Sequence, residues 1–386
     1  MRRRTLDVLL LLAAGVAAGC GAGEPPAPAA LTRGPYLQLL TGRTVTVVWR
    51  TNRAAACSLA IRRLDGPPRV VPGAAGEGCA VAVDGLEPGA RYAYAPRADG
   101  RPLLDESVFR ADDPDGAFRF AVVGDSGSGS RRQRAVAERI LASAPHFVLH
   151  TGDVVYERGE AERFDEAFFR PYAALLRTAA VWPSLGNHDV RTRDGLPWRD
   201  AFYTPADNPE ASEAYYSFDF GNAHVVVLDS NQDAGPGSAQ HRFLVRSLGS
   251  TLATWRFVVL HHTLYSGGRY GGDVRLRAAL APVFDRFGVH VVFMGHDHDY
   301  ERTVPLVGGR PAPNGAGTVY VTTGGGGKSI HPVRRTETTA YAESAYHFVR
   351  VAVAGETLRL EMVRHDGVVR DATTLVATPG GVRGEA

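Results

Sequence analysis

Side chains that can bind metal ions follow apolar runs at five places in the chain. The five segments are 124-GDSG-127, 152-GDVVY-156, 186-GNHD-189, 258-VVLHH-262 and 293-FMGHDH-298. Ligands in open α/β sheets gather outside the carboxyl ends of the strands, so we expect these side chains to lie together. Together they offer carboxylates, a phenol, an amide and imidazoles. Chance could easily produce one Gly-Asp pair, but it would rarely produce five such segments in this order.

Carboxylates crowded into one cleft beside neutral imidazoles would repel each other unless cations lay between them. A pair of metal ions about 3.5–4 Å apart with a shared carboxylate removes that repulsion and is used for phosphoester chemistry. The mixed nitrogen and oxygen set suits Fe, Zn or Mn, and a tyrosine ligand favours trivalent iron. Glycine before each acid permits a sharp turn and a close approach to the ions.

Apolar segments rich in β-branched residues supply strands that would position these ligands. The predicted strands are 118–123, 146–150, 224–228, 256–260, 289–294 and 318–323. Residues 274–287 carry apolar side chains on one face at helical spacing. Buried strands joined by helices predict an α/β layered domain with an at least partly parallel sheet. Residues 347–369 alternate like a closing β-hairpin, with a turn at Ala354-Gly355.

Residues 31–110 show a different pattern, in which short alternating runs are separated by Gly, Pro and Asp. This pattern predicts an all-β sandwich, and the turn and tyrosines of 84-DGLEPGARYAY-94 resemble fibronectin type III domains. The segment contains no ionisable cluster, so we expect a structural or spacer role. The polar break 111-ADDPDGA-117 would separate it from a second domain at 118–386.

Residues 1–20 have the features of an export signal: a cationic start, a short apolar run, and small residues before Cys20. Ala17-Ala18-Gly19-Cys20 resembles the lipobox of bacterial lipoproteins, which implies lipidation of Cys20. Ordinary secretory cleavage is the alternative. Residues 21–30, rich in Gly, Pro and Ala, predict a disordered tether. We expect an extracytoplasmic protein, either a membrane-anchored lipoprotein or a periplasmic or secreted one.

The composition is that of a soluble globular protein, with 44% hydrophobic and 22% charged residues in 386. The net charge of +2 gives no indication of a nucleic-acid surface or a polybasic membrane patch. Besides Cys20, Cys57 and Cys79 are the only cysteines, and both lie in the predicted β-sandwich. In an oxidising compartment we expect a disulfide between them, with two free thiols as the alternative.

The order GDxG, GDxxY, GNH(D/E), VxxH and GHxH resembles the purple acid phosphatases, a branch of the calcineurin-like metallophosphoesterases. The similarity extends through 33-RGPYLQ-38 and 298-HDYER-302 and covers nearly the whole exported chain. It implies a ferric ion and a divalent Fe, Zn or Mn ion, bridged by Asp153. The implied ligands are Asp125, Tyr156 and His298 for the ferric ion, and Asn187, His261 and His296 for the divalent ion.

The resemblance also implies which residues contact substrate. His188 matches the histidine that contacts the phosphate and protonates the leaving group. Plant relatives carry a further histidine pair where this chain reads 268-GRYGG-272, and His262 or Tyr270 could compensate. Tyr265 is expected at the pocket mouth. The run of glycines before Lys328, the only lysine in the chain, lacks the spacing of a phosphate loop and predicts a flexible turn.

These features predict a dinuclear-metal phosphoester hydrolase, most simply an acid phosphatase that cleaves phosphomonoesters by in-line attack of a metal-bound hydroxide. Phosphodiester or nucleotide-pyrophosphate hydrolysis on the same metals is one alternative. A tethered binding protein with a relic metal site is another. The expected partners are small-molecule phosphate esters, with no nucleic acid and with a membrane contacted only through Cys20. The sequence leaves the oligomeric state open.

Overall fold

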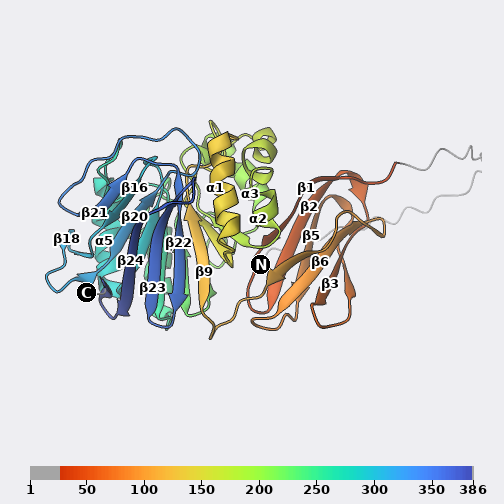
Figure 1. The fold of residues 1–386 in the computed structure, drawn as a ribbon, viewed down its shortest axis with the longest axis horizontal. Helices are drawn as coiled ribbons and strands as arrows, with labels where there is room; N and C mark the ends of the chain where they lie inside the picture. Colours follow the sequence, from red (N-terminus) through yellow and green to blue (C-terminus); the bar gives the residue numbers. More distant parts are fainter. Residues whose placement is uncertain (1–26, 385–386) are drawn as a thin grey trace, which may run out of the picture.

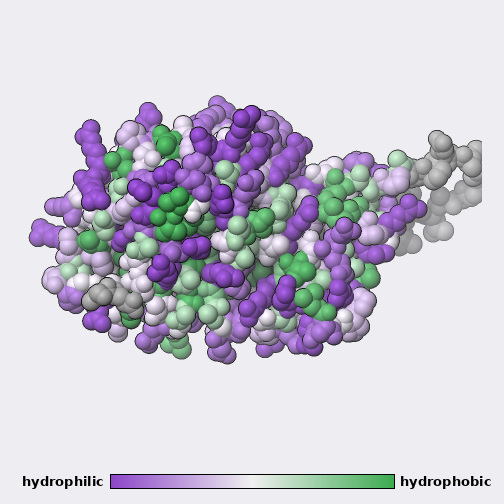
Figure 2. All heavy atoms as spheres, viewed as in Figure 1, coloured by the Kyte–Doolittle hydropathy of each residue, from purple (hydrophilic) through white to green (hydrophobic). Residues whose placement is uncertain are grey.

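The computed structural model describes residues 27–384 of the chain. Figure 1 shows two groups of strands, a smaller one coloured red to orange beside a larger one coloured yellow to blue. The predicted export signal, Cys20 and most of the predicted tether lie outside the described residues. No helix within residues 27–384 combines the length and apolar character that a bilayer crossing requires. Figure 2 shows a mainly hydrophilic face on which apolar patches are small and separate.

The smaller group consists of two antiparallel sheets. One has the strand order β1-β2-β5, and the other is built on the order β4-β3-β6-β7 with β8 also paired to β6. Their bounds are β1 Leu31–Gln38, β2 Thr44–Ala55, β3 Cys57–Arg63, β4 Arg69–Pro72, β5 Gly76–Asp84, β6 Arg91–Ala98, β7 Arg101–Pro102 and β8 Ser107–Arg110.

One apolar core lies between these two sheets and contains Trp49, Leu59 and Tyr94. Buried residues alternate with more exposed ones along β3 and along the second half of β5, as expected for strands with one face on the core of a sandwich. Cys57 on β3 and Cys79 on β5 form the predicted disulfide. Because β3 and β5 belong to different sheets, this bond ties the two halves of the sandwich together.

The smaller group docks on the larger one through the segment 33-RGPYLQ-38 of β1. The Arg33 guanidinium contacts the Asp165 carboxylate at 2.5 Å, and the Tyr36 hydroxyl donates to the Ala201 carbonyl at 2.9 Å. The Tyr36 ring also lies 4.8 Å from the ring of Phe169. These contacts join distant parts of the chain, which agrees with a structural role for the amino-terminal sheets.

The larger group contains two large sheets, each mixing parallel and antiparallel pairs, and a two-stranded sheet of β17 (Leu306–Val307) and β18 (Arg310–Pro311). The eight-stranded sheet has the order β11-β10-β9-β22-β23-β24-β25-β19, and the seven-stranded sheet has the order β12-β13-β14-β15-β20-β16-β21. The strands that carry the site are β9 Phe118–Val123, β10 Phe147–His150, β11 Ala180–Pro183, β14 Trp255–Val259 and β15 Val291–Met294. The remaining strands of the two sheets are β12 Tyr216–Phe220, β13 Ala223–Val227, β16 Tyr300–Thr303, β19 Ala316–Gly317, β20 Val319–Thr323, β21 Thr339–Glu343, β22 His347–Ala354, β23 Thr357–Arg364, β24 Val369–Thr378 and β25 Gly381–Gly384.

Both faces of each central strand are buried, which explains why these strands read as continuous apolar runs. On β9, Phe120 points into the core between the sheets, whereas Ala121 belongs to a second core beneath the helices. The Phe120 ring lies 4.8 Å from Phe147 of its own sheet and 5.5 Å from Phe257 of the other. Helices α1 (Arg131–Ala142), α4 (Ala239–Ser250) and α5 (Val274–Phe287) contribute apolar side chains to that second core.

The predicted helix 274–287 is confirmed as α5, with the same bounds. The Asp273 side chain accepts hydrogen bonds from the first-turn amides, and Gly288 ends the helix with a φ of +59°. The predicted carboxy-terminal hairpin is also confirmed, as Ala354 of β22 pairs with Thr357 of β23. β22 then pairs with β9, so the end of the chain completes the sheet that begins the larger group.

Candidate metal centre

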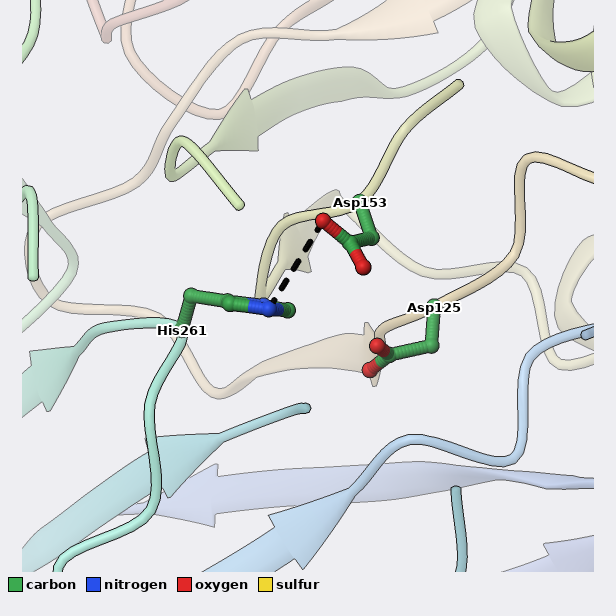
Figure 3. A group of neighbouring side chains, drawn as sticks. All are labelled: Asp125, Asp153 and His261. Atoms are coloured by element: carbon green, nitrogen blue, oxygen red, sulfur yellow. Dashed lines mark ion pairs between the residues drawn. The ribbon is translucent and has the colours of Figure 1, made fainter. Parts of the chain in front are cut away.

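The predicted metal ligands all follow the carboxyl ends of central strands. Strands β9, β10 and β11 run parallel to one another in one sheet, and β14 and β15 run parallel in the other. Asp125, Asp153 and His261 follow three of these strands, and Figure 3 shows their side chains facing one another. Their ligand atoms lie within 4.8 Å of each other and all three residues are buried. The site therefore forms where the carboxyl ends of strands from the two large sheets come together.

A first group of three donor atoms comes from Asp125, Tyr156 and His298. The Tyr156 hydroxyl lies 3.1 Å from Asp125 Oδ1 and 3.2 Å from His298 Nε2. His298 Nε2 lies 3.4 Å from Asp125 Oδ1. Ligands about 2.0–2.2 Å from one ion are separated from each other by about 2.9–3.5 Å in tetrahedral or octahedral geometry. These three atoms have the spacing of ligands to a single cation.

A second group of three donor atoms comes from Asn187, His261 and His296. Asn187 Oδ1 lies 3.0 Å from His261 Nε2 and 3.1 Å from His296 Nδ1. The two ring nitrogens are 3.3 Å apart. This spacing again matches one coordination sphere, so the chain provides two adjacent sets of ligands of the predicted composition.

Backbone carbonyls fix which nitrogen of two histidines faces the site. His261 Nδ1 donates to the Thr151 carbonyl at 2.9 Å, and His298 Nδ1 donates to the Ser329 carbonyl at 2.7 Å. A carbonyl only accepts, so each Nε2 presents a lone pair to the site. His261 Nε2 and Asn187 Oδ1 are then two acceptors at 3.0 Å, a repulsive contact that a cation removes. The residues present thus fit a pair of metal ions.

Asp153 has the contacts expected of a ligand shared between the two groups. Its Oδ1 lies 3.6 Å from His261 Nε2 and accepts a hydrogen bond from the His188 amide at 2.9 Å. Its carboxylate also belongs to the cluster that contains Asp125 of the first group. Asp125 is held in turn by the His296 amide, which donates to its Oδ2 at 2.9 Å.

Burial disfavours the charged forms of Asp125, Tyr156, His261 and His296. It raises the pKa of Asp125 to about 6, even though His298 lowers it by hydrogen bonding. Burial and the nearby carboxylates also raise the pKa of the Tyr156 phenol. Burial lowers the pKa of His261, and lowers that of His296 to about 2. The imidazoles of His261 and His296 are therefore neutral, and the anionic groups of the site need positive countercharge.

The expected role of glycine before each acid is confirmed only in part. Gly152 has a φ of +95°, but the sharp turns elsewhere fall on the ligands themselves, with φ of +56° at Asp125, +55° at Asp153 and +68° at His296. Asp and His adopt this region more readily than most residues. The other glycines serve close approach, because an added Cβ would collide with neighbouring atoms at Gly124, Gly186 and Gly295.

His188 lies at the edge of the site with one nitrogen directed at the metal ligands. Its Nδ1 donates to the Glu157 carbonyl at 2.6 Å, and its Nε2 lies 4.0 Å from Asp153 Oδ2. The imidazole packs edge-on against the Tyr156 ring at 4.6 Å. It faces a pocket of about 430 Å³, lined by Asp153, Tyr156, Glu157, Asn187, His188, Arg191, Arg269, Tyr270, His296, His298, Lys328, Ser329 and His331.

The other predicted substrate contacts are placed differently. His262 Nδ1 lies 2.8 Å from the Ser230 hydroxyl, and its ring lies behind His296 at 4.6 Å without lining the pocket. Tyr265 packs against Tyr320 at 4.6 Å and lines a separate cavity, so the structure does not bring it to the metal ligands. Tyr270 does line the pocket, where its ring stacks on His296 at 4.6 Å.

Asp189 is a structural part of the site that sequence reasoning missed. Its buried carboxylate accepts hydrogen bonds from the amides of Val154 at 3.2 Å, Val155 at 3.2 Å and Gly186 at 2.9 Å. It therefore joins the loop that carries Asp153 to the loop that carries Asn187 of the second set. The acid that follows GNH was the available signal.

The prediction of a flexible turn before Lys328 is wrong. Residues 324–327 are buried, and their backbone is hydrogen bonded on both sides. The Gly326 amide donates to the Gly124 carbonyl at 3.0 Å, and the Lys328 amide donates to the Asp125 carbonyl at 3.0 Å. The glycines are needed for space, because a Cβ at any of the four would collide with neighbouring atoms. This packed loop brings Lys328 to the pocket.

Comparison with known proteins agrees with this geometry. Residues 118–300 match the calcineurin-like phosphoesterases, and residues 317–372 match the family described as iron/zinc purple acid phosphatase-like protein C. The first match spans all of the predicted metal ligands, and the fold and site are similar to those of calcineurin-like metallophosphoesterases. The second match, over residues 317–372, relates strands β20 to β23 and the start of β24 to the purple acid phosphatases.

Individual proteins of known name are also similar to this chain. Purple acid phosphatase 21 of Arabidopsis thaliana is 30% identical over 259 residues, which are 64% of this chain and 57% of the relative. A barley (Hordeum vulgare) nucleotide pyrophosphatase/phosphodiesterase is 26% identical over 59% of this chain and 71% of its own. The structure of a purple acid phosphatase from yellow lupin (Lupinus luteus) seeds shares the fold, with a TM-score of 0.78 at 20% identity over 92% of this chain and 74% of that one. The chain spans about half the length of the curated relatives it matches.

Proposed function

We propose that the protein hydrolyses phosphomonoesters at a pair of metal ions, as an acid phosphatase does. The observation that carries the proposal is the pair of adjacent donor sets, each with ligand atoms 3.0 to 3.4 Å apart and each open to one pocket. A carboxylate shared between them would complete a dinuclear centre. Such centres serve in-line displacement at phosphorus.

The residues of the chain divide the work of that reaction. When bound, the ions supply Lewis-acid activation of a water and neutralise charge on the phosphate. His188 presents Nε2 to the pocket because its Nδ1 is committed to the Glu157 carbonyl. In its protonated form, this nitrogen donates a proton to the departing alkoxide, which is the costly leaving group at mild pH. Burial of Asp125 and His261 excludes bulk water from the inner side of the two donor groups.

The proposed metals are Fe(III) at Asp125, Tyr156 and His298, and a divalent Fe, Zn or Mn at Asn187, His261 and His296. A phenolate is a hard, strongly donating anion that favours the trivalent ion. Burial and nearby carboxylates raise the pKa of the Tyr156 phenol, so a high positive charge is needed to ionise it. The two imidazoles of the second set suit a softer, divalent ion.

Hydrolysis of phosphodiesters or nucleotide pyrophosphates at the same centre is a second candidate. Two observations favour it: the name of the barley relative, and the segment 268-GRYGG-272 in place of a histidine pair. With fewer pocket histidines to protonate a poor leaving group, the site would depend more on the leaving group's own acidity.

The test uses full-length protein purified with its metals and assayed from acid to neutral pH. Metal analysis should give two ions per chain, and 4-nitrophenyl phosphate should be hydrolysed faster than bis(4-nitrophenyl) phosphate. The reverse preference would establish the second candidate. Protein that holds two metals but cleaves neither ester would overturn both, and protein that never binds metal would favour a tethered binding protein.

We also propose that the amino-terminal sandwich is a fibronectin III-like module and that the protein is exported, with Cys20 as the site of a lipid anchor. The disulfide between Cys57 and Cys79 supports export, since such bonds persist in oxidising compartments. The two-sheet arrangement supports the module assignment. Mass spectrometry of the mature amino terminus would test the anchor.

A further inference from the structure

The loop that carries Lys328 is built to hold that residue in place at the pocket. The Ser128 and Ser130 hydroxyls donate to the Gly327 carbonyl at 2.9 and 3.0 Å, and the Lys328 amide donates to the Asp125 carbonyl at 3.0 Å. The Lys328 backbone is thereby fixed directly beside a metal ligand. Ordering four consecutive glycines costs conformational entropy, so reversing the chain direction is not a sufficient reason for this loop. Holding Lys328 at the pocket is a second reason.

The Lys328 side chain reaches across the pocket wall. Its ammonium lies over the Tyr156 ring, 4.6 Å from the centroid, and forms an ion pair with the Glu157 carboxylate. The Glu157 side chain is 62% exposed, so this pair is worth at most about 1 kcal/mol. Stability alone therefore does not account for a lysine at this point, in a chain whose every other Lys or Arg position is arginine.

Two further cations face the same pocket. Arg191 and Arg269 both line it, and both are exposed. Within residues 27–384, no carboxylate lies within ion-pair distance of either guanidinium, and Glu157 pairs only with Lys328 and weakly with His188. The rim thus carries three cations against one exposed carboxylate. A simple monoester would leave this charge unmatched, because its single phosphate is taken by the metal centre.

We propose that Lys328, Arg191 and Arg269 form an anion-binding rim that selects phosphate esters carrying a second phosphate group. This inference rests on the proposed phosphatase function. Glu157 occupies Lys328 when substrate is absent, and the second phosphate displaces it. Lysine suits this exchange because its compact ammonium can turn on a flexible stem from one anion to another. The exposed ring of Tyr270 lies beside Arg269 and completes the pocket mouth.

In the proposed exchange, loss of Lys328 weakens binding of the bisphosphate, whereas loss of the Glu157 carboxylate strengthens it. A purely structural ion pair predicts no such opposite effects. Lys328→Gln should raise KM for glucose 1,6-bisphosphate about tenfold and lower its kcat/KM relative to glucose 6-phosphate. Glu157→Gln should lower KM for the bisphosphate by roughly two- to fivefold, because it removes a competing anion. If the pair were only structural, both substitutions would break it alike, and neither would change the ratio between the two substrates.

Arg191→Gln should also lower the preference for the bisphosphate. Its matched control is Arg193→Gln, since Arg193 is an exposed arginine two residues away that does not line the pocket. Equal effects of these two variants would show that general surface charge, and not the rim, sets the preference.

Binding must be measured apart from turnover, so that failure of the rim and failure of the phosphatase can be told apart. Calorimetric titration with methylenediphosphonate, which cannot be hydrolysed, should show tighter binding than inorganic phosphate, and Lys328→Gln should reduce that advantage about tenfold. Hydrolysis of monophosphates without any bisphosphate or diphosphonate preference would overturn the rim and leave the phosphatase standing. Tight diphosphonate binding by a metal-loaded but inactive protein would support the rim and overturn the phosphatase.

Discussion

Replacing Asp189 tests whether one buried carboxylate holds the two halves of the metal centre together. In Asp189→Ala, the amides of Val154, Val155 and Gly186 lose their acceptor inside the protein. Each buried, unsatisfied amide costs about 1–3 kcal/mol. Because water can enter the space left by the carboxylate, we expect a loss at the lower end, about 3–5 kcal/mol. A domain of this size loses about 2 °C of Tm per kcal/mol, so Tm should fall by about 6–10 °C.

Asp189→Asn should cost less, for a reason visible in the contacts. Asp189 Oδ2 accepts from both Val154 and Gly186, whereas Oδ1 accepts only from Val155. An asparagine that places its oxygen at the Oδ2 position keeps two of the three hydrogen bonds. We expect a loss of about 2 kcal/mol, which places this variant between wild type and Asp189→Ala.

The assay combines thermal unfolding with metal analysis of the dialysed protein. The loops that carry Asp153 and Asn187 should separate in Asp189→Ala, so that variant should retain fewer than two ions per chain. Asp200→Ala, which removes an exposed carboxylate from the same region, serves as the control. Our reasoning is refuted if Asp189→Ala keeps both ions and unfolds within about 1 °C of the Asp200→Ala protein.

Three further predictions concern other parts of the molecule. Tyr156→Phe should abolish any visible charge-transfer absorption of the metal-loaded protein while leaving its fold intact by circular dichroism; unchanged colour would exclude the phenol as an iron ligand. Replacing Cys57 and Cys79 together by serine should cost about 3 kcal/mol of unfolding free energy, given their separation of 22 residues, and equal urea midpoints would contradict this. Tyr36→Phe removes the hydroxyl that donates to the Ala201 carbonyl and should cost about 1 kcal/mol; a Tm equal to wild type would show that the contact between the two groups of strands does not depend on it.

Local pattern in the sequence was enough to predict many of the elements. The helix at 274–287 was recognisable because its apolar side chains recur on one face within one short segment. The strands of the two large sheets were recognisable because burial on both faces demands an unbroken apolar run. The types of candidate ligand could also be predicted, because each follows its strand within a few residues. The motifs that suggest the family are likewise local, so they can be recognised without knowledge of tertiary contacts.

Tertiary structure decided how those pieces combine. That β22 completes the sheet of β9 depends on residues more than 200 positions apart, and no local periodicity reports such a pairing. The role of Asp189 and the packed loop before Lys328 also became visible only when separate loops met, because hydrogen bonds and close contacts between distant segments leave no spacing rule in the chain. The order of residues specifies which donor side chains the protein has. The fold sets the distances between them, and those distances give two groups of donors the spacing of coordination sites.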